Sequence, residues 1–221
     1  MASRRSANSN ESDPGDLGAA PDREELRAAA LSYLARYAST QMALTRVLDR
    51  RIDNWARKQG SRYEADDADR ATVKAAVATA KALAREIVAT MGRVGAVDDA
   101  AFAETRASSL RRAGRSHRAV AAALAAKGID PETAREALDN PEVGSAAAEQ
   151  TAALRLARKR RIGPFRIAGP PDPAGQLREL AILARAGFAQ NVARQTLEME
   201  RAEAEARLHA PPETTIEAIG G

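Results

Sequence analysis

The sequence predicts an all-α protein, and three observations support this fold class. The hydrophobic fraction of 44% is rich in alanine, the best helix former, whereas aromatic residues make up only 3% of the 221 residues. Apolar residues recur at helical spacing along most of the chain. Glycines, prolines and N-capping residues separate these segments at short intervals. We therefore expect about nine helices with thin apolar seams and no strand.

Three helices are predicted between residues 22 and 95. Asp22 with Glu25 forms a capping box for the first helix, and Thr40 caps the second. An acidic loop with Asp66, Asp67 and Asp69 precedes the third. The apolar faces of the three helices carry, in order, Leu26, Ala30, Tyr33, Leu34 and Tyr37; Leu44, Leu48, Ile52 and Trp55; and Val73, Val77, Ala80, Ala84, Ile87 and Met91.

Six more helices are predicted between residues 98 and 208. Their start signals are Asp98 or Asp99, Ser116, Asp130-Pro131, Asn140-Pro141, Asp172-Pro173 and Gln190. Gly114, Gly128 and Gly187 end three of them, and Gly163-Pro164 breaks the helix that finishes at Arg161. The last helix is expected to continue to Leu208. Residues 1–21 and 209–221 lack the apolar content of a packed segment, so we expect disordered tails there.

One stretch of the sequence occurs twice. Residues 124–129 (LAAKGI) match residues 183–188 (LARAGF), and Ala134, Arg135 and Leu138 match Ala193, Arg194 and Leu197 at the same offset. We interpret each copy as a helix that ends at glycine, an apolar contact residue and a short helix that packs back. Because the first three helices fit the same plan, we expect three tandem three-helix units at residues 22–95, 96–139 and 140–208.

Residues 91–138 carry a more specific pattern. In order they contain Gly92, Gly95-Ala96-Val97-Asp98-Asp99, Phe102-Ala103, Arg112-Ala113-Gly114-Arg115-Ser116 and Leu124-Ala125-Ala126-Lys127-Gly128-Ile129, and Tyr33-Leu34-Ala35-Arg36 precedes them. With the three-unit organisation, this pattern resembles the RecX family over roughly residues 22–200. The chain departs from the usual family pattern at residues 60–91 and 164–173.

The resemblance implies both a fold and a function. The implied fold is a series of tandem three-helix repeats that form an elongated, curved body. The implied function is regulation of DNA repair and recombination: the protein binds RecA–DNA filaments and inhibits the recombinase and ATPase activities of RecA. Family members also contact DNA, so single- or double-stranded DNA is a second expected partner. We expect a monomer without a cofactor.

A run of six cations is the strongest candidate for a binding surface: Arg155, Arg158, Lys159, Arg160, Arg161 and Arg166. No acidic residue interrupts them, and four are consecutive, so they cannot all pair locally. Interaction with the helix macrodipole accounts for one or two cations at a helix end, but not for six. We therefore interpret the run as a docking site for phosphates or for an acidic protein groove.

A second cluster consists of Arg111, Arg112, Arg115 and Arg118 around Gly114. The backbone N–H groups at the following helix start would suit an anion. An ordinary exposed loop explains the cluster equally well, and both interpretations stay open. The sequence does not show whether the two clusters share one face.

No enzymatic chemistry is indicated. The chain has no cysteine, no phosphate-binding glycine loop and only two histidines, His117 and His209, which lie far apart and are expected at the surface without a metal. Asp98 and Asp99 are interpreted as helix-capping residues and not as a catalytic pair. Trp55 and Phe165 are expected to pack, although Phe165 beside the basic run could stack on a base.

The charge balance and the termini narrow the function classes further. The chain has 34 Lys and Arg against 30 Asp and Glu, and this excess alone does not identify a nucleic-acid-binding protein. Without a signal-peptide core or an apolar run of membrane length, we expect a cytoplasmic protein with no membrane partner. The alternatives to a RecA regulator are a stand-alone nucleic-acid-binding protein and a helical scaffold for another partner that uses the seam at residues 73–91.

Overall fold

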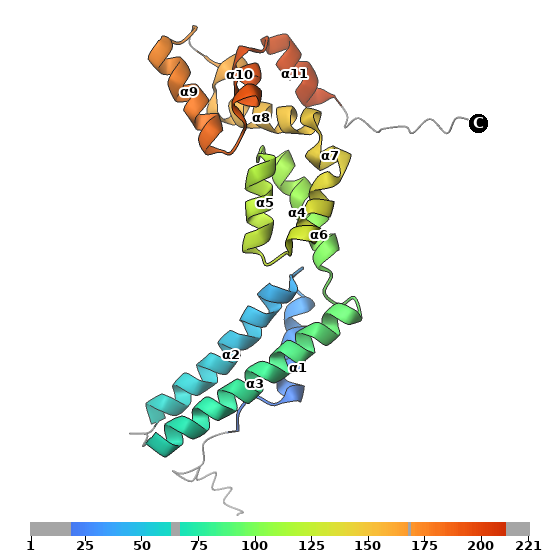
Figure 1. Ribbon diagram of the computed structural model, residues 1–221, viewed down its shortest axis with the longest axis vertical. Helices are drawn as coiled ribbons and strands as arrows, with labels where there is room; N and C mark the ends of the chain where they lie inside the picture. The colour runs from blue at the N-terminus through green and yellow to red at the C-terminus, as the bar shows by residue number, and fades with distance from the viewer. Residues whose placement is uncertain (1–18, 63–66, 168, 211–221) are drawn as a thin grey trace, which may run out of the picture. The chain divides into compact units, whose positions relative to one another are not determined.

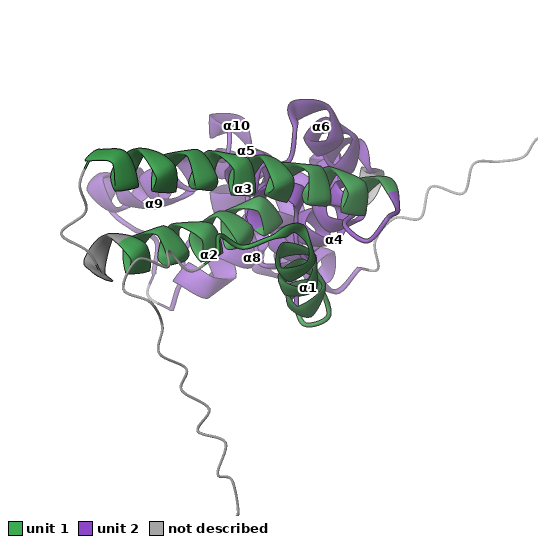
Figure 2. Ribbon diagram, turned by 90° about the horizontal axis from the view of Figure 1, so that it is seen from below, with its two compact units in different colours: residues 1–36, 44–93 green, residues 37–43, 94–221 purple. Residues whose placement is uncertain are grey.

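The computed structural model describes residues 19–62, 67–167 and 169–210, and this part of the chain is helical without any strand. The chain divides into two compact units, to which the described residues up to 36 and from 44 to 93, and those from 37 to 43 and from 94 onward, respectively belong (Figure 2). The described residues form eleven α-helices and one short 3-10 helix (Figure 1). The all-α prediction is therefore confirmed.

The first unit contains three helices: α1 (Arg23–Leu34), α2 (Gln41–Arg62) and α3 (Asp67–Arg93). Asp22 caps α1 by accepting a hydrogen bond from the Glu25 N–H at 2.8 Å. The core of this unit is formed by apolar residues that the helical spacing predicts, including Leu26, Ala30, Leu44, Leu48, Ile52, Ala80, Ala84, Ile87 and Met91. An ion pair between Lys81 and Asp53, 2.8 Å long, joins α3 to α2.

Two expectations for this region are wrong. Tyr37 lies beyond the end of α1 and is 54% exposed, because the helix stops at Leu34 before the chain completes another turn. Asp67 and Asp69 lie in the first turn of α3 and not in a preceding loop, where they interact favourably with the positive end of the helix dipole. Asp66 lies outside the described residues. Trp55 lies on α2 and is half-buried.

The second helix group consists of α4 (Asp99–Arg112), α5 (His117–Ala126) and α6 (Pro131–Asp139). Asp98, Ser116 and Asp130 cap these helices with their side chains, as predicted. Their core contains Ala103, Ala107, Val120, Leu124, Ile129 and Leu138. The short helix α7 (Pro141–Gly144) follows and contacts α6.

The third helix group consists of α8 (Ala146–Arg160), the 3-10 helix η1 (Gly163–Phe165), α9 (Pro173–Arg185) and α10 (Gln190–Glu198). Its core contains Leu154, Ile162, Phe165, Leu183 and Phe188, which confirms the packing interpretation of Phe165. The additional helix α11 (Arg201–His209) contacts α8 and η1.

The structure has more helices than the nine predicted. Ser145 caps a new helix at Ala146 by accepting from the Ala148 N–H, so the predicted helix from Pro141 is divided into α7 and α8. Met199 adopts an extended backbone, with ψ of 141°, and this separates α10 from α11. The tails predicted at 1–21 and 209–221 lie almost entirely outside the described residues. The boundaries proposed for the three units stay a prediction.

The repeated stretch has the same local geometry in both copies. Gly128 and Gly187 have φ of 79° and 90°, in the left-handed region that favours glycine. The N–H of the next residue donates to a carbonyl five residues back in both cases, Ile129 to Leu124 and Phe188 to Leu183, each at 3.2 Å. The two helix ends are therefore equivalent in structure as well as in sequence.

Two hydrogen bonds also recur inside the second unit. The Thr40 hydroxyl donates to the Lys127 carbonyl, and the Ser116 hydroxyl donates to the Ala186 carbonyl, both at 2.7 Å. In each case the N–H of the residue after the hydroxyl donates to a carboxylate at 2.9 Å: Gln41 to Asp99 and His117 to Glu149. In both cases the hydroxyl contacts the end of a later helix, α5 or α9, and the N–H contacts a carboxylate in the first turn of the helix before it, α4 or α8.

Candidate partner-binding surface

The two predicted cation clusters meet where the end of α4 crosses α8. Gly114 makes this approach possible: a Cβ at this residue would lie 3.0 Å from the Leu156 backbone nitrogen and 3.2 Å from the Ala152 carbonyl oxygen. The Arg155 Nη1 donates to the Arg111 carbonyl at 3.4 Å, a long hydrogen bond across the crossing. The chain thus brings Arg111, Arg112 and Gly114 of the first cluster close to Arg155 and Arg158 of the second, a proximity that the sequence alone could not show.

Charge at this crossing is strongly positive. Burial lowers the pKa of Arg155, and the neighbouring cations Arg111, Arg112 and Arg158 lower it further. Arg112 comes from the first cluster and Arg158 from the second, so the electrostatic contact joins the clusters directly. Backbone packing at Gly114 and the ion pair between Arg111 and Glu149 hold the crossing against the repulsion between its cations.

Seven cations of the two clusters are exposed, and within the described residues none has an acidic side chain within 4.0 Å. We call this set the basic surface: Arg112, Arg115, Arg118, Arg158, Lys159, Arg160 and Arg161. Arg158, Lys159 and Arg160 lie in the last turn of α8, where the helix dipole favours cations.

Arg111 was predicted to belong to the exposed cation cluster, but the structure buries it. It is 3% exposed and forms an ion pair with Glu149 of α8, and its Nη1 also donates to the Arg115 carbonyl at 2.9 Å. Its Nε and Nη2 have no hydrogen-bond partner among the described residues. The helical period contained the signal for this burial, because Ala103, Ala107 and Arg111 follow one another at intervals of four. Arg111 therefore supports the crossing from inside.

Glu149 is the residue that sequence reasoning missed. The same oxygen, Oε2, accepts from Arg111 and from the His117 N–H at 2.9 Å, so one carboxylate connects α4, α5 and α8. The predicted anion position at the start of α5 is thus filled by a carboxylate of the chain itself. No local pattern marks Glu149, since its partners lie 32 and 38 residues away in sequence.

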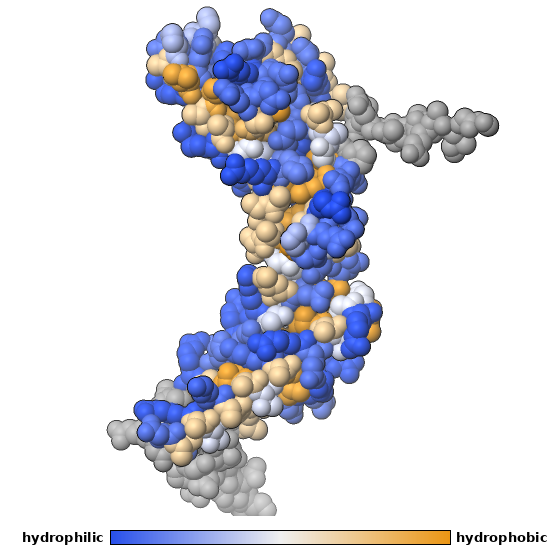
Figure 3. Space-filling model, viewed as in Figure 1, coloured by the Kyte–Doolittle hydropathy of each residue, from blue (hydrophilic) through white to orange (hydrophobic). Residues whose placement is uncertain are grey.

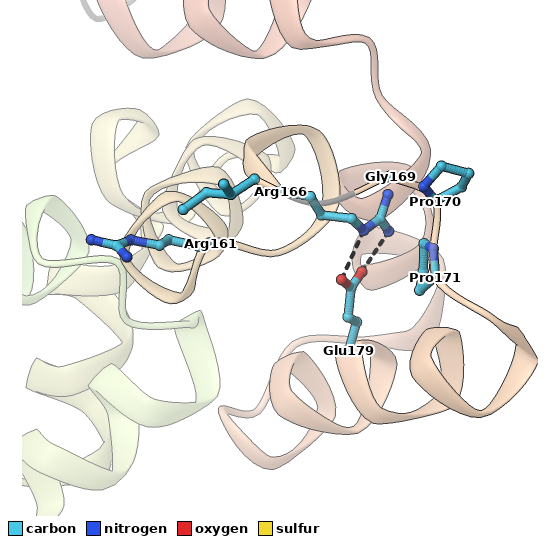
Figure 4. Close-up of a pocket in the computed structure, with 7 residues that line it drawn as sticks. Arg161, Arg166, Gly169, Pro170, Pro171 and Glu179 are labelled. Atoms are coloured by element: carbon cyan, nitrogen blue, oxygen red, sulfur yellow. Dashed lines mark hydrogen bonds and ion pairs between the residues drawn. The ribbon is translucent and has the colours of Figure 1, made fainter.

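Arg166 was predicted to belong to the docking run, but the structure pairs it with an acidic residue. It forms a two-pronged ion pair with Glu179 of α9, with 2.8 Å between its Nε and Oε1 (Figure 4). This hydrogen bonding raises the pKa of Arg166, and Glu179 also accepts from the Gly163 N–H at 3.2 Å. The pair holds η1 against α9, and Figure 4 shows the Arg161 guanidinium pointing away from it. Arg166 belongs to the internal packing of the third helix group.

Arg161 adopts an unusual backbone conformation. With φ of 57° and ψ of 47°, it is the only non-glycine residue with positive φ among the described residues. This conformation costs an L-residue about 1–2 kcal/mol, and glycine is the usual solution. Gly114 has the corresponding position at the end of α4, with the same pattern of carbonyl acceptors. The third helix group therefore presents an arginine where the second has a glycine.

The structure also shows where the remaining candidate residues lie, the two aspartates and the two histidines. Asp98 caps α4, and Asp99 accepts from the Gln41 N–H, so neither is part of a catalytic pair. His117 and His209 are both exposed, as predicted. Within the described residues, His, Cys, Asp and Glu side chains form no group of three that could hold a metal ion. None of the described helices has the length and apolar character that a membrane span requires.

Comparison with known proteins decides the family. The family model "RecX, second three-helix domain" matches residues 98–138, which contain α4, α5 and α6. The Regulatory protein RecX of Myxococcus xanthus (strain DK1622) is 35% identical over 173 residues, covering 78% of this chain and 84% of the relative. The chain belongs to the RecX family.

Other RecX proteins cover less of the chain. The Regulatory protein RecX of Agrobacterium fabrum (strain C58 / ATCC 33970) is 35% identical over 135 residues, or 61% of this chain and 70% of the relative. The Regulatory protein RecX of Thermobifida fusca (strain YX) is 40% identical over 118 residues, or 51% of this chain and 60% of the relative. No solved structure gives a significant match. The family assignment agrees with the resemblance seen in the sequence, and the relatives are named as regulatory proteins.

Proposed function

We propose that this RecX-family protein binds RecA–DNA filaments and inhibits the recombinase and ATPase activities of RecA. Family membership supports the regulatory role, and the basic surface supplies a chemical means of docking. In this proposal the protein acts in the cytoplasm, as a monomer that needs no cofactor. It contributes to the control of DNA repair and recombination.

The observation that carries this proposal is the crossing at Gly114. It holds the positive charges of Arg112, Arg155 and Arg158 close enough to repel one another. Within the described residues, none of these three arginines forms an ion pair with an acidic side chain. A filament offers anionic groups in its phosphates and on its protein surface, and either would neutralise these cations. We therefore assign docking to the basic surface, with Arg155 as a partly buried contributor.

A second candidate function is stand-alone nucleic-acid binding, which the seven exposed cations favour. Phosphate contacts of this kind release counterions, so the affinity for DNA would fall steeply with salt. Removal of Arg158, Lys159, Arg160 and Arg161 would then reduce the slope of log affinity against log salt by about 0.7 for each lost contact with single strands. Tight binding to filaments without binding to naked DNA would exclude this candidate.

The test is RecA ATP hydrolysis on single-stranded DNA, titrated with the full chain. We expect the wild type to inhibit hydrolysis, and we expect a variant with alanine at residues 158–161 to require a higher concentration for the same inhibition. Circular dichroism of the variant controls for folding. Unchanged hydrolysis at a several-fold excess of wild type over RecA would contradict the proposed function.

A further inference from the structure

A groove in the second helix group lies beside the basic surface. It is open, has a volume of about 340 Å³ and lies between α5 and α6. Ala121, Ala125, Ile129, Ala134 and Leu138 provide its apolar lining. In Figure 3 the surface over α5 is coloured as apolar, with hydrophilic residues beside it.

The groove exists where one side chain is smaller than its counterpart in the third helix group. The equivalent glycines Gly128 and Gly187 set an offset of 59 residues, and this offset places Leu180 opposite Ala121 in the alignment. Leu180 is half-buried and packs against the core of its own group. Ala121 has the smaller side chain at this position, and it lines the groove.

Charged groups border the groove. His117 lines it and is the first residue of α5, directly between Ser116 and Arg118, so one end of the groove lies at the basic surface. Arg135 lines the groove from α6, and its ion pair with Asp139 is exposed and 3.6 Å long. Asp139 lines the groove as well and offsets the charge of Arg135, so the cation that a binding partner finds without an acidic counter-ion among the described residues is Arg118, the residue after His117.

An apolar groove with a cation beside it favours a protein partner over a nucleic acid. A phosphate backbone satisfies cations but does not fill an apolar groove, whereas an amphipathic protein segment does both. We infer that the α5–α6 groove binds an acidic, amphipathic segment of a protein partner, with one leucine-sized side chain in the space beside Ala121. A carboxylate of that segment pairs with Arg118. This inference rests on the proposed function in taking the partner to be the protein component of the filament.

The test uses the full chain with Ala121→Leu, which fills the groove with the residue found in the third helix group. Ala122→Leu is the matched control, because Ala122 is the next residue on α5, is exposed and does not line the groove. We expect Ala121→Leu to raise the Kd for RecA filaments on single-stranded DNA about tenfold, a typical effect of apolar pocket complementarity. The Kd for naked single-stranded DNA should not change. Equal filament binding by wild type and Ala121→Leu overturns the inference.

A second measurement separates this inference from the proposed function. The probe is a synthetic helical peptide with leucine on one face and glutamate on the other, and its binding is measured by calorimetric titration. We expect wild type and Ala122→Leu to bind it and Ala121→Leu to bind at least several-fold more weakly, whether or not the protein inhibits RecA. Absence of peptide binding by wild type overturns the inference, even if RecA is inhibited. If sedimentation shows a wild-type dimer that Ala121→Leu dissociates, the occupant is a second copy and the inference is likewise wrong.

Discussion

The second and third helix groups share the same helix-end geometry but differ in the residue that ends their first helices. Their second helices end at equivalent glycines, Gly128 and Gly187, with equal hydrogen bonds. Their first helices end at Gly114 in one group and Arg161 in the other. Gly114 permits close packing on α8, whereas Arg161 accepts backbone strain and adds a cation. A single residue at one helix end thus decides between internal packing and surface charge.

The largest effect is expected from removing the contact that ties the two groups together. Glu149→Ala leaves the Arg111 guanidinium buried without its counter-charge and deprives the His117 N–H of its acceptor. Breaking a buried pair in this way costs about 3–5 kcal/mol of unfolding free energy. Urea denaturation measures the loss. Glu203→Ala, which breaks the exposed Arg207–Glu203 pair, is the control and should cost less than about 0.5 kcal/mol. Equal losses would show that Glu149 does not hold the crossing.

A smaller loss is expected at the crossing itself. Gly114→Ala puts an L-residue at φ of 79° and a Cβ 3.0 Å from the Leu156 backbone nitrogen. The left-handed conformation alone costs about 1–2 kcal/mol, and the backbone contact adds to it. Gly169→Ala is the matched control, since no atom lies within 4 Å of its Cβ position and its φ is not positive. Thermal unfolding should show a lower Tm for Gly114→Ala only, and equal melting of the two variants would contradict the close approach.

The smallest effect on the free energy of unfolding is expected at Arg161, and it is a gain in stability. Arg161→Gly relieves the left-handed strain of an arginine, and the gain is reduced by the greater entropy of glycine in the unfolded chain. We expect a net stabilisation of up to about 1 kcal/mol, accompanied by weaker binding to RecA filaments. Arg158→Gly, within α8, removes the same charge but should destabilise by roughly 1 kcal/mol. A loss of stability in Arg161→Gly would mean that its side chain supports the fold.

Most of the fold could be predicted because its signals are local. Asp22, Thr40, Asp98, Ser116, Asp130 and Asp172 each cap a helix through a side-chain hydrogen bond to a nearby N–H. Residue type and position predicted these caps, with Asp99 as the alternative to Asp98. The glycine ends of α5 and α9 were visible as a repeat for the same reason. The divisions between α7 and α8 and between α10 and α11 were missed because Ser145 and Met199 lie within segments whose composition favours continuous helix.

The candidate surface was only partly predictable, because its geometry depends on contacts between distant residues. The sequence identified both cation clusters but could not show that Gly114 brings them together on α8. Arg111 and Arg166 were placed with the exposed cations, although Glu149 and Glu179 hold them inside the fold. The four-residue spacing from Ala103 through Ala107 indicated the burial of Arg111, whereas nothing local indicated its partner.

The central claim is that the two clusters act as one docking surface, and binding to RecA filaments of three charge-matched variants tests it most directly. One variant has alanine at Arg112, Arg115 and Arg118, the second at Arg158, Arg160 and Arg161, and the third at Arg46, Arg50 and Arg51 of α2, which are also exposed. We predict that the first two variants bind filaments much more weakly than wild type, while the third binds nearly as tightly. Equal weakening by all three would show that positive charge anywhere on the chain suffices, and would contradict a specific surface at the α4–α8 crossing.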